Sequence, residues 1–201
     1  TFFYRILQQA GLDRPVPFSL SGTCHGKIQG SGVIIGEVTG DASLSLRFDD
    51  QETAIPVVLL YVRAGATLQL GEIFNAPHTY KQMVIIAESD AQIKYTQNLY
   101  HGHVNHTRVY VHQGAHYELR SAYYVYGEQM YTFNGVYHEG AHSNALLQIQ
   151  GVARDSAHVL NDGMVRIEKH TGDCKGYQSI NGLLLDRTSQ ISNEPMLEIY
   201  H

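Results

Sequence analysis

The segments Asp41-Ala42-Ser43-Leu44-Ser45-Leu46 and Gly65-Ala66-Thr67-Leu68-Gln69-Leu70 share the pattern that decides the expected fold. A turn-forming residue precedes a small one, and apolar residues follow the small residue two and four positions later. The pattern returns at Asp90-Ala91 and Gly114-Ala115, and looser copies lie at Gly140-Ala141, Ser156-Ala157, Asp173-Cys174 and Thr188-Ser189. An internal repeat of this kind is typical of solenoid proteins.

The spacing of the repeat indicates how the chain coils. The small residues of successive copies are 24, 25, 24, 26, 16, 17 and 15 positions apart. About 24 residues make one coil of a parallel β-solenoid, and the shorter spacings predict a narrower coil of two strands with tight turns. We expect each small residue to point inward at a crowded corner, because strand side chains alternate between faces. On spacing alone, a β-sandwich remains an alternative.

Composition also favours an all-β fold. The 201 residues include 14 Tyr, 12 His, 19 Gly and no Trp, and Val, Ile and Thr are frequent, which suits pleated strands. A short N-terminal helix is predicted where apolar residues from Phe2 to Ala10 share one helical face before Gly11. The glycine-rich residues 19–40 fit either a loop-rich entry or a distorted first layer of strands. We therefore divide the chain into an entry segment, residues 1–40, and a β-helix core, residues 41–201.

Charge and cysteine content exclude some functions. The chain has 14 basic and 19 acidic residues, a net charge of −5, and no Lys/Arg run, which argues against nucleic-acid binding. The longest apolar stretch, residues 55–62, contains Pro56 and is far shorter than the roughly 18 residues of a membrane-spanning helix, so we expect no membrane insertion. Two cysteines, distant in sequence, make no disulfide framework. We expect a cytoplasmic protein.

Four motifs in the last third of the chain carry a family resemblance. They are Asp162-Gly163-Met164-Val165-Arg166-Ile167, Gly176-Tyr177-Gln178, Leu183-Leu184-Leu185-Asp186-Arg187 and Glu194-Pro195-Met196-Leu197-Glu198-Ile199. In order and spacing they resemble the end of the SufB/SufD core. Weaker likeness at residues 55–58 and 101–127 extends the resemblance to roughly residues 50–201. The family fold is a parallel β-helix, which the repeat predicts independently.

The resemblance implies a subunit of the SUF machinery for iron–sulfur cluster assembly, in which SufB and SufD pair and the ABC-type ATPase SufC drives the complex. SufB-like members carry a cysteine in the strand after the equivalent of Gln178, where a thiolate can accept sulfur. Here Ser179, Ile180 and Asn181 follow, so we expect a SufD-like, non-enzymatic subunit. Any iron or iron–sulfur cluster is expected to be held transiently, in a complex.

The resemblance also bears on the end of the sequence. The family continues into a Cys-x-His-Gly-Ala segment and C-terminal helices that dock SufC, whereas this sequence stops at His201. We therefore expect a trimmed or short member, with SufC as a partner only if a C-terminal tail exists.

The last coil is the predicted partner-binding site. An end coil needs a cap or a partner, because open strand edges otherwise aggregate, and in the family this end meets the partner subunit. We predict pairing with a SufB-like subunit or a second copy through five apolar side chains: Leu183, Leu185, Met196, Leu197 and Ile199.

Six histidines are candidate metal ligands. His101 and His103 are two apart and share a face if their strand is regular, with His112 nearby in sequence. We expect these three to be structural. Three others, His116, His142 and His158, each follow a small residue of the repeat, which predicts an outward ladder on successive coils. The ladder too is expected to be structural.

No catalytic or metal site is predicted. Cys174 occupies a small-residue corner, as a free cysteine can, and Cys24 beside His25 is weak evidence for a metal site. The sequence has no glycine-rich phosphate loop and no G-x-S-x-G elbow.

Tyrosines concentrate in the middle of the chain, at Tyr123, Tyr124, Tyr126, Tyr131 and Tyr137. Such side chains can line a carbohydrate groove or cover a protein interface. The alternative function is therefore a β-helical carbohydrate-binding or carbohydrate-active protein. We favour the interface, because no cluster of catalytic acids accompanies the tyrosines.

Overall fold

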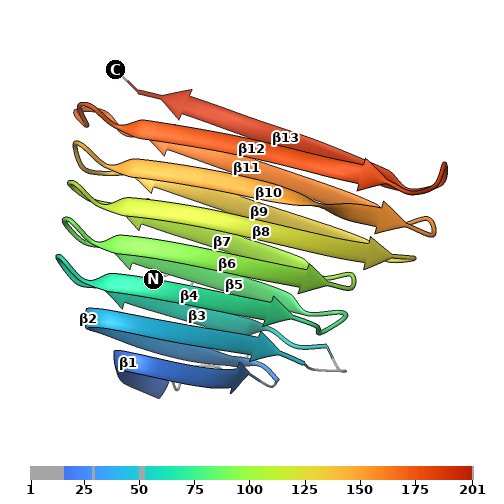
Figure 1. The fold of residues 1–201 in the computed structure, drawn as a ribbon, viewed down its shortest axis with the longest axis horizontal. Coiled ribbons are helices and arrows are strands. Elements are labelled where there is room, and N and C mark those ends of the chain that lie inside the picture. The colour runs from blue at the N-terminus through green and yellow to red at the C-terminus, as the bar shows by residue number, and fades with distance from the viewer. Residues whose placement is uncertain (1–15, 29, 50–52, 201) are drawn as a thin grey trace.

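The computed structural model describes residues 16–28, 30–49 and 53–200, and every regular element in these ranges is a β-strand. The predicted helix over residues 2–10 lies outside them. The strands, labelled in Figure 1, are β1 (Val16–Ile28), β2 (Gly32–Phe48), β3 (Pro56–Val62), β4 (Thr67–Phe74), β5 (Tyr80–Ala87), β6 (Gln92–Tyr100), β7 (Val104–Val111), β8 (His116–Tyr126), β9 (Gln129–His138), β10 (Asn144–Arg154), β11 (His158–Ile167), β12 (Lys175–Leu184) and β13 (Gln190–Ile199).

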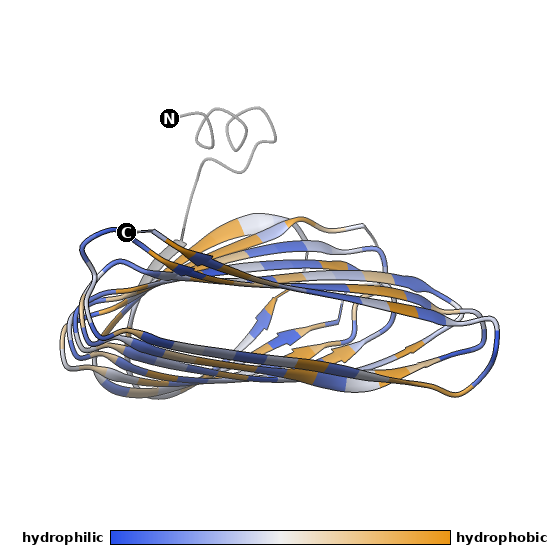
Figure 2. Ribbon diagram, turned by 90° about the horizontal axis from the view of Figure 1, so that it is seen from above, coloured by the Kyte–Doolittle hydropathy of each residue, from blue (hydrophilic) through white to orange (hydrophobic). Residues whose placement is uncertain are grey.

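The strands wind into a parallel β-solenoid, as the repeat predicts. Even-numbered strands stack from β2 to β12 and odd-numbered strands from β3 to β13, and the strand pairs are parallel. The long strand β2 belongs to both stacks, because residues 32–38 pair with β3 and residues 41–48 pair with β4. Viewed along its axis, the solenoid is a flattened tube of two sheets that face each other (Figure 2).

The glycine-rich entry forms strands. β1 pairs with β2 along both parts of its length, with a register shift between Leu20 and Gly22. Of the two alternatives for residues 19–40, the structure therefore shows the layer of strands. The boundary predicted at residue 40 falls inside β2. Among the described residues there is no helix that is long and apolar enough to cross a membrane.

The core lies between the two sheets and consists of stacked rows of inward side chains. One row contains, coil after coil, Leu44, Leu70, Tyr95, Leu119 and Leu147, all of them buried. Successive residues along β4 and β6 alternate between buried and more exposed positions, because neighbouring strand side chains point to opposite faces. Each coil therefore buries its apolar row against the coils on either side.

A small residue occupies the corner before each even-numbered strand from β4 to β12. Backbone hydrogen bonds to the carbonyls of Ala66, Ala91, Ala115 and Ser143 join successive coils there. This corner corrects two details of the predicted repeat. The predicted Ala141 lies outside this row, since Ser143 occupies the corner. Ala42 is buried but pairs with Leu68 rather than lying below Ala66.

The coils lengthen toward the C-terminus, so the predicted narrowing is wrong. Ser143 and Cys174, at one corner, are 31 positions apart, and Ala157 and Ser189, at the opposite corner, are 32 apart. The short spacings of 15 to 17 residues therefore measure half-coils between opposite corners. Small residues occur at both corners, so their spacing in sequence does not measure the length of a whole coil.

Candidate functional site

The last coil, formed by β12 and β13, has one unpaired side. β12 pairs with β10 and β13 pairs with β11. No described strand pairs with the other edge of either one, which is the top edge in Figure 1. Backbone N–H and C=O groups along an unpaired edge can bind an added strand. From Gly176 to Leu184 the edge of β12 carries no charged residue, so it lacks the charges that commonly block strand addition.

Exposed apolar side chains gather on this coil. Of the 13 large apolar side chains that are exposed among the described residues, eight lie between Tyr177 and Tyr200. Large apolar patches on a protein surface commonly mark interaction sites. The last coil therefore combines an open backbone edge with an apolar surface.

All five residues predicted to bind a partner are exposed, with Leu197 at 60% and Leu183 at 56%. Leu197 pairs with the buried Val165, so it extends an interior row of the core to the open end. Ile199 likewise extends an inward row. Leu183 and Met196 lie instead on the outer surface of the coil, by the alternation of their strands.

The five residues form two groups rather than one. Leu183 and Leu185 lie at the turn between β12 and β13, whereas Met196, Leu197 and Ile199 lie toward the far end of β13 (Figure 1). The prediction omitted three further exposed side chains of the coil, Tyr177, Leu184 and Tyr200. Leu184 was detectable from sequence, because it belongs to the same Leu-Leu-Leu motif as its predicted neighbours.

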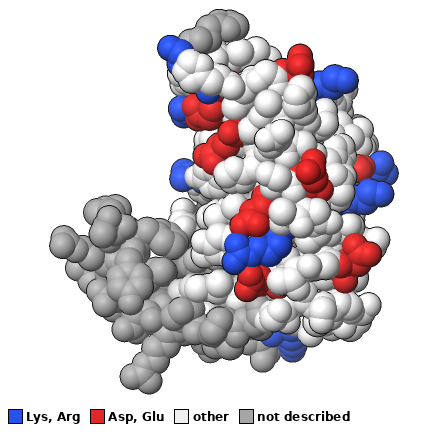
Figure 3. All heavy atoms as spheres, turned by 90° about the vertical axis from the view of Figure 1, so that its left-hand side faces the viewer, with Lys and Arg blue, Asp and Glu red and all other residues white. Residues whose placement is uncertain are grey.

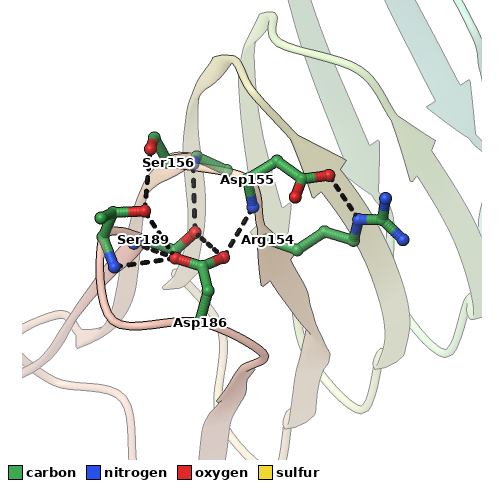
Figure 4. A network of polar contacts seen from close by, with 7 residues as sticks. Arg154, Asp155, Ser156, Asp186 and Ser189 are labelled. Atoms are coloured by element: carbon green, nitrogen blue, oxygen red, sulfur yellow. Dashed lines mark hydrogen bonds and ion pairs between the residues drawn. The ribbon is translucent and has the colours of Figure 1, made fainter.

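Asp186 fixes the turn that carries the first group. Its carboxylate accepts hydrogen bonds from the backbone N–H groups of Thr188 and Ser189, both at 2.8 Å, and from both hydroxyls at the same distance. It also accepts the N–H of Asp155, at 2.6 Å, from the turn of the preceding coil (Figure 4). The hydrogen bonds from Thr188 and Ser189 hold the pKa of the Asp186 carboxyl well below its usual range.

The turn of the preceding coil, between β10 and β11, has an unusual backbone conformation. Asp155 and Ser156 have φ angles of 57° and 65°, in the left-handed region that non-glycine residues rarely adopt. The Ser156 hydroxyl donates to Thr188 at 2.8 Å, and Arg154 pairs with Asp155 at 2.6 Å (Figure 4). The two turns therefore hold the Leu183–Leu185 group in a fixed position.

The histidines that the structure describes are dispersed along the solenoid rather than gathered at one point. His103 is buried, its ring stacks on Phe74 at 4.1 Å, and burial lowers its pKa to about 3. His101 lies in the turn before β7, with a φ of 67°, and its ring is 3.6 Å from Glu128. The expectation that His101 and His103 share a strand face is therefore wrong. The described residues contain no group of three or more His, Cys, Asp or Glu side chains that could hold a metal ion.

The predicted histidine ladder is also wrong. His116 begins β8 and His158 begins β11, which belong to different sheets. Each stacks on Gln or Asn in the adjacent coils rather than on another histidine. His142 lies in a turn, 3.6 Å from Asp173, and His112 likewise lies in a turn, 3.7 Å from Glu139.

The cysteines occupy structural positions. Cys174 follows Ser143 in the corner row, and its Sγ lies 3.3 Å from the Ser143 hydroxyl and from the Gly140 carbonyl oxygen. Cys24, in β1, is half-buried and packs against the core. Both are free thiols.

The five tyrosines lie in three parts of the solenoid: the interior and the outer faces of the two sheets. Tyr123 is buried in the interior, and Tyr124 and Tyr126 lie on the outside of the even-numbered sheet. Tyr131 and Tyr137 lie on the outside of the odd-numbered sheet. A groove of about 510 Å³ crosses the starts of β9, β11 and β13, and Tyr131 is the one of these five tyrosines that lines it. The five tyrosines, although close in sequence, therefore do not line one aromatic groove.

Charged side chains are mixed on the face formed by the turns at one edge of the solenoid. Figure 3 shows acidic and basic groups interspersed over this face. One example is Arg63, which pairs with Glu37 and Glu88. Such alternation gives no continuous basic surface on the face in view.

Together, the fold and the exposed coil define a class of protein: a parallel β-solenoid whose last coil presents an unpaired, apolar edge. The sequence then identifies the family. Residues 25–201 match the SufBD core domain of the SUF system for FeS cluster assembly, and the chain belongs to this family. The match begins at residue 25, earlier than the resemblance at roughly residue 50. No individual curated protein matches the sequence.

Proposed function

We propose that this chain is a SufD-like, non-enzymatic subunit of a cytoplasmic complex that assembles iron–sulfur clusters, and that its last coil pairs with a SufB-type subunit or with a second copy. The observation that carries the proposal is the concentration of exposed apolar side chains on the last coil of a SufBD core domain. Membership of the family supports a role in SUF cluster assembly. The pairing and the SufD-like role are our inference.

Residues of β12 support the SufD-like role. The positions after Gln178 carry Ser179, Ile180 and Asn181, and none of these offers a thiolate to accept sulfur or bind iron. The iron–sulfur cluster is then cargo of the complex, and its ligands come at least partly from the partner. SufC docks on this subunit if the natural protein has the tail found in the family.

Strand addition is the mode of pairing that the last coil supports best. The edge of β12 offers backbone hydrogen bonds over ten residues, and it carries no charged residue after Lys175. β13, by contrast, carries Glu194, Pro195 and Glu198, and charges and proline both disfavour strand addition. We therefore place the partner's first contact along β12, with Leu183 and Leu184 at its end.

Light scattering coupled to size-exclusion chromatography tests the proposal. The chain is run alone and with a SufB-type subunit of the same organism. A mass equal to a pair supports the proposal, and Leu184→Lys should reduce pairing because it places a charge at the end of the β12 edge along which the partner is placed. The matched control is Ile73→Lys, an exposed apolar position on β4, far from the last coil. Unpaired chains in both runs would contradict the proposal.

A further inference from the structure

Polar side chains run through the interior of the solenoid, where apolar rows are expected. Nine of them are almost completely buried: Glu72, Lys81, Gln97, Asn105, Thr107, Ser121, Thr132, Asn134 and Asn161. They form rows along both sheets. In the even-numbered sheet Glu72, Gln97 and Ser121 lie in register on successive strands. In the odd-numbered sheet Asn105, Thr132 and Asn161 do the same.

The two rows face each other across the interior. Lys81, which lies in register below Asn105, donates to both carboxylate oxygens of Glu72 at 2.7 Å, and to the Tyr95 hydroxyl at 3.1 Å. Tyr95 in turn donates to Glu72, and Gln97 donates to Tyr95 at 2.8 Å. Because Glu72 and Lys81 belong to opposite sheets, the positions above them, Gln97 and Asn105, also face each other.

Beyond the ion pair several polar atoms of these rows lack protein partners. Gln97 Oε1, Asn105 Nδ2, Ser121 Oγ and both amide atoms of Asn134 are fully buried and have no hydrogen-bond partner. Exchanging the amide O and N of Asn134 changes nothing, since both atoms are unpartnered. Native proteins rarely leave buried polar atoms without partners, and ordered water is the usual partner where protein groups are absent.

The unpartnered buried atoms restrict which ligand can satisfy them. The unpartnered atoms include acceptors, such as Gln97 Oε1, and donors, such as Asn105 Nδ2, so a ligand must both donate and accept. It must be neutral, because the Glu72–Lys81 pair already balances its own charges. It must also be small enough to fit between stacked coils. We propose that the interior between β6 and β9 binds a chain of water molecules.

This chain of water has one closed end and one open end. On the side of the ion pair the Lys81 ammonium lies 5.7 Å from the Phe48 ring centroid and 6.0 Å from that of Phe74, and the two rings stack. On the other side Thr132 donates to Asn161 at 3.0 Å, and Asn161 donates to Asn193 at 2.9 Å. Asn193 is exposed on the last coil. Polar side chains in register therefore line a route from the buried ion pair to the end of the solenoid, and the proposed water molecules would join them.

Water magnetic relaxation dispersion tests this inference on the full chain, because it counts water molecules that stay bound far longer than surface water. The wild type should show long-lived internal water, and Asn134→Leu should show fewer such molecules. The matched control is Met83→Leu, since Met83 lies in the same inward row as Thr107 and Asn134 but is apolar. It should keep the wild-type number.

Two outcomes of the relaxation experiment would overturn the inference: a wild type without long-lived water, or an Asn134→Leu variant with as many bound molecules as the wild type. Ser121→Ala repeats the test without adding bulk, should Asn134→Leu fail to fold. A crystal structure that shows ordered water within hydrogen-bond distance of Gln97 Oε1 and Asn134 would support the proposal, and a dry interior would refute it. The inference does not depend on the proposed pairing.

Discussion

The buried ion pair allows a prediction about stability. Glu72 and Lys81 each have 0% exposed side chain, so Lys81→Met leaves a carboxylate buried without its counter-ion. Breaking a buried pair in this way typically costs about 3–5 kcal/mol. With a urea m value of about 3 kcal/mol/M, the unfolding midpoint should fall by about 1–1.7 M. Urea unfolding followed by circular dichroism measures the change.

Two further variants make this prediction refutable. Glu72→Gln combined with Lys81→Met leaves no buried charge and should recover most of the lost stability. Lys94→Met, at an exposed position on β6, should change stability by no more than about 0.5 kcal/mol. If Lys81→Met costs less than about 1 kcal/mol, or if the double variant is as unstable as the single one, the pair does not stabilise the interior as argued.

Three other predictions concern the turn, the glycines and pH. Asp186→Asn should speed hydrogen–deuterium exchange in the turn between β12 and β13, because it weakens the carboxylate's hydrogen bonds; unchanged exchange there would refute its role. Gly151→Ala should lower stability by about 1–3 kcal/mol, because the new Cβ would lie 2.3 Å from Tyr123. Gly71→Ala meets nothing within 4 Å and should be neutral in the same denaturation assay; equal effects would contradict the packing. Burial lowers the pKa of His138 from 6.5 to about 4, so the folded chain binds fewer protons than the unfolded chain between these values. This contribution to stability is complete above pH 6.5 and is lost as pH falls toward 4. The melting temperature should therefore fall less steeply over this range in His138→Gln, and an identical slope would refute the assignment.

The sequence predicted the coil but not its register. Ala66, Ala91 and Ala115 form a corner row because each coil between them has nearly the same length. Ala42 was predicted to lie in the same corner row as Ala66, but it is shifted by two positions along the strand. The sequence does not reveal this shift, because side chains two positions apart on a strand face the same way and the apolar pattern is unchanged. The structure resolves this shift by pairing Ala42 with Leu68.

The exposed last coil was predicted more successfully than the polar interior. Leu183 and Leu197 stood out because they are apolar residues on the last strands. Lys81 could not be singled out from sequence, because a lysine in a strand is usually exposed. Its position in the strand indicates that it points inward, because Lys81 is two and four positions before the inward residues Met83 and Ile85 of β5. Its partner Glu72 could not be found from sequence, because the contact depends on how the two sheets face each other.

Pairing through the last coil is the central claim, and hydrogen–deuterium exchange resolved by peptide tests it most directly. Exchange is measured for the chain alone and after mixing with the SufB-type subunit. The account predicts slower exchange in β12, residues 175–184, because its open edge gains backbone hydrogen bonds. A complex that forms with unchanged exchange in β12 and slower exchange on another face would contradict it.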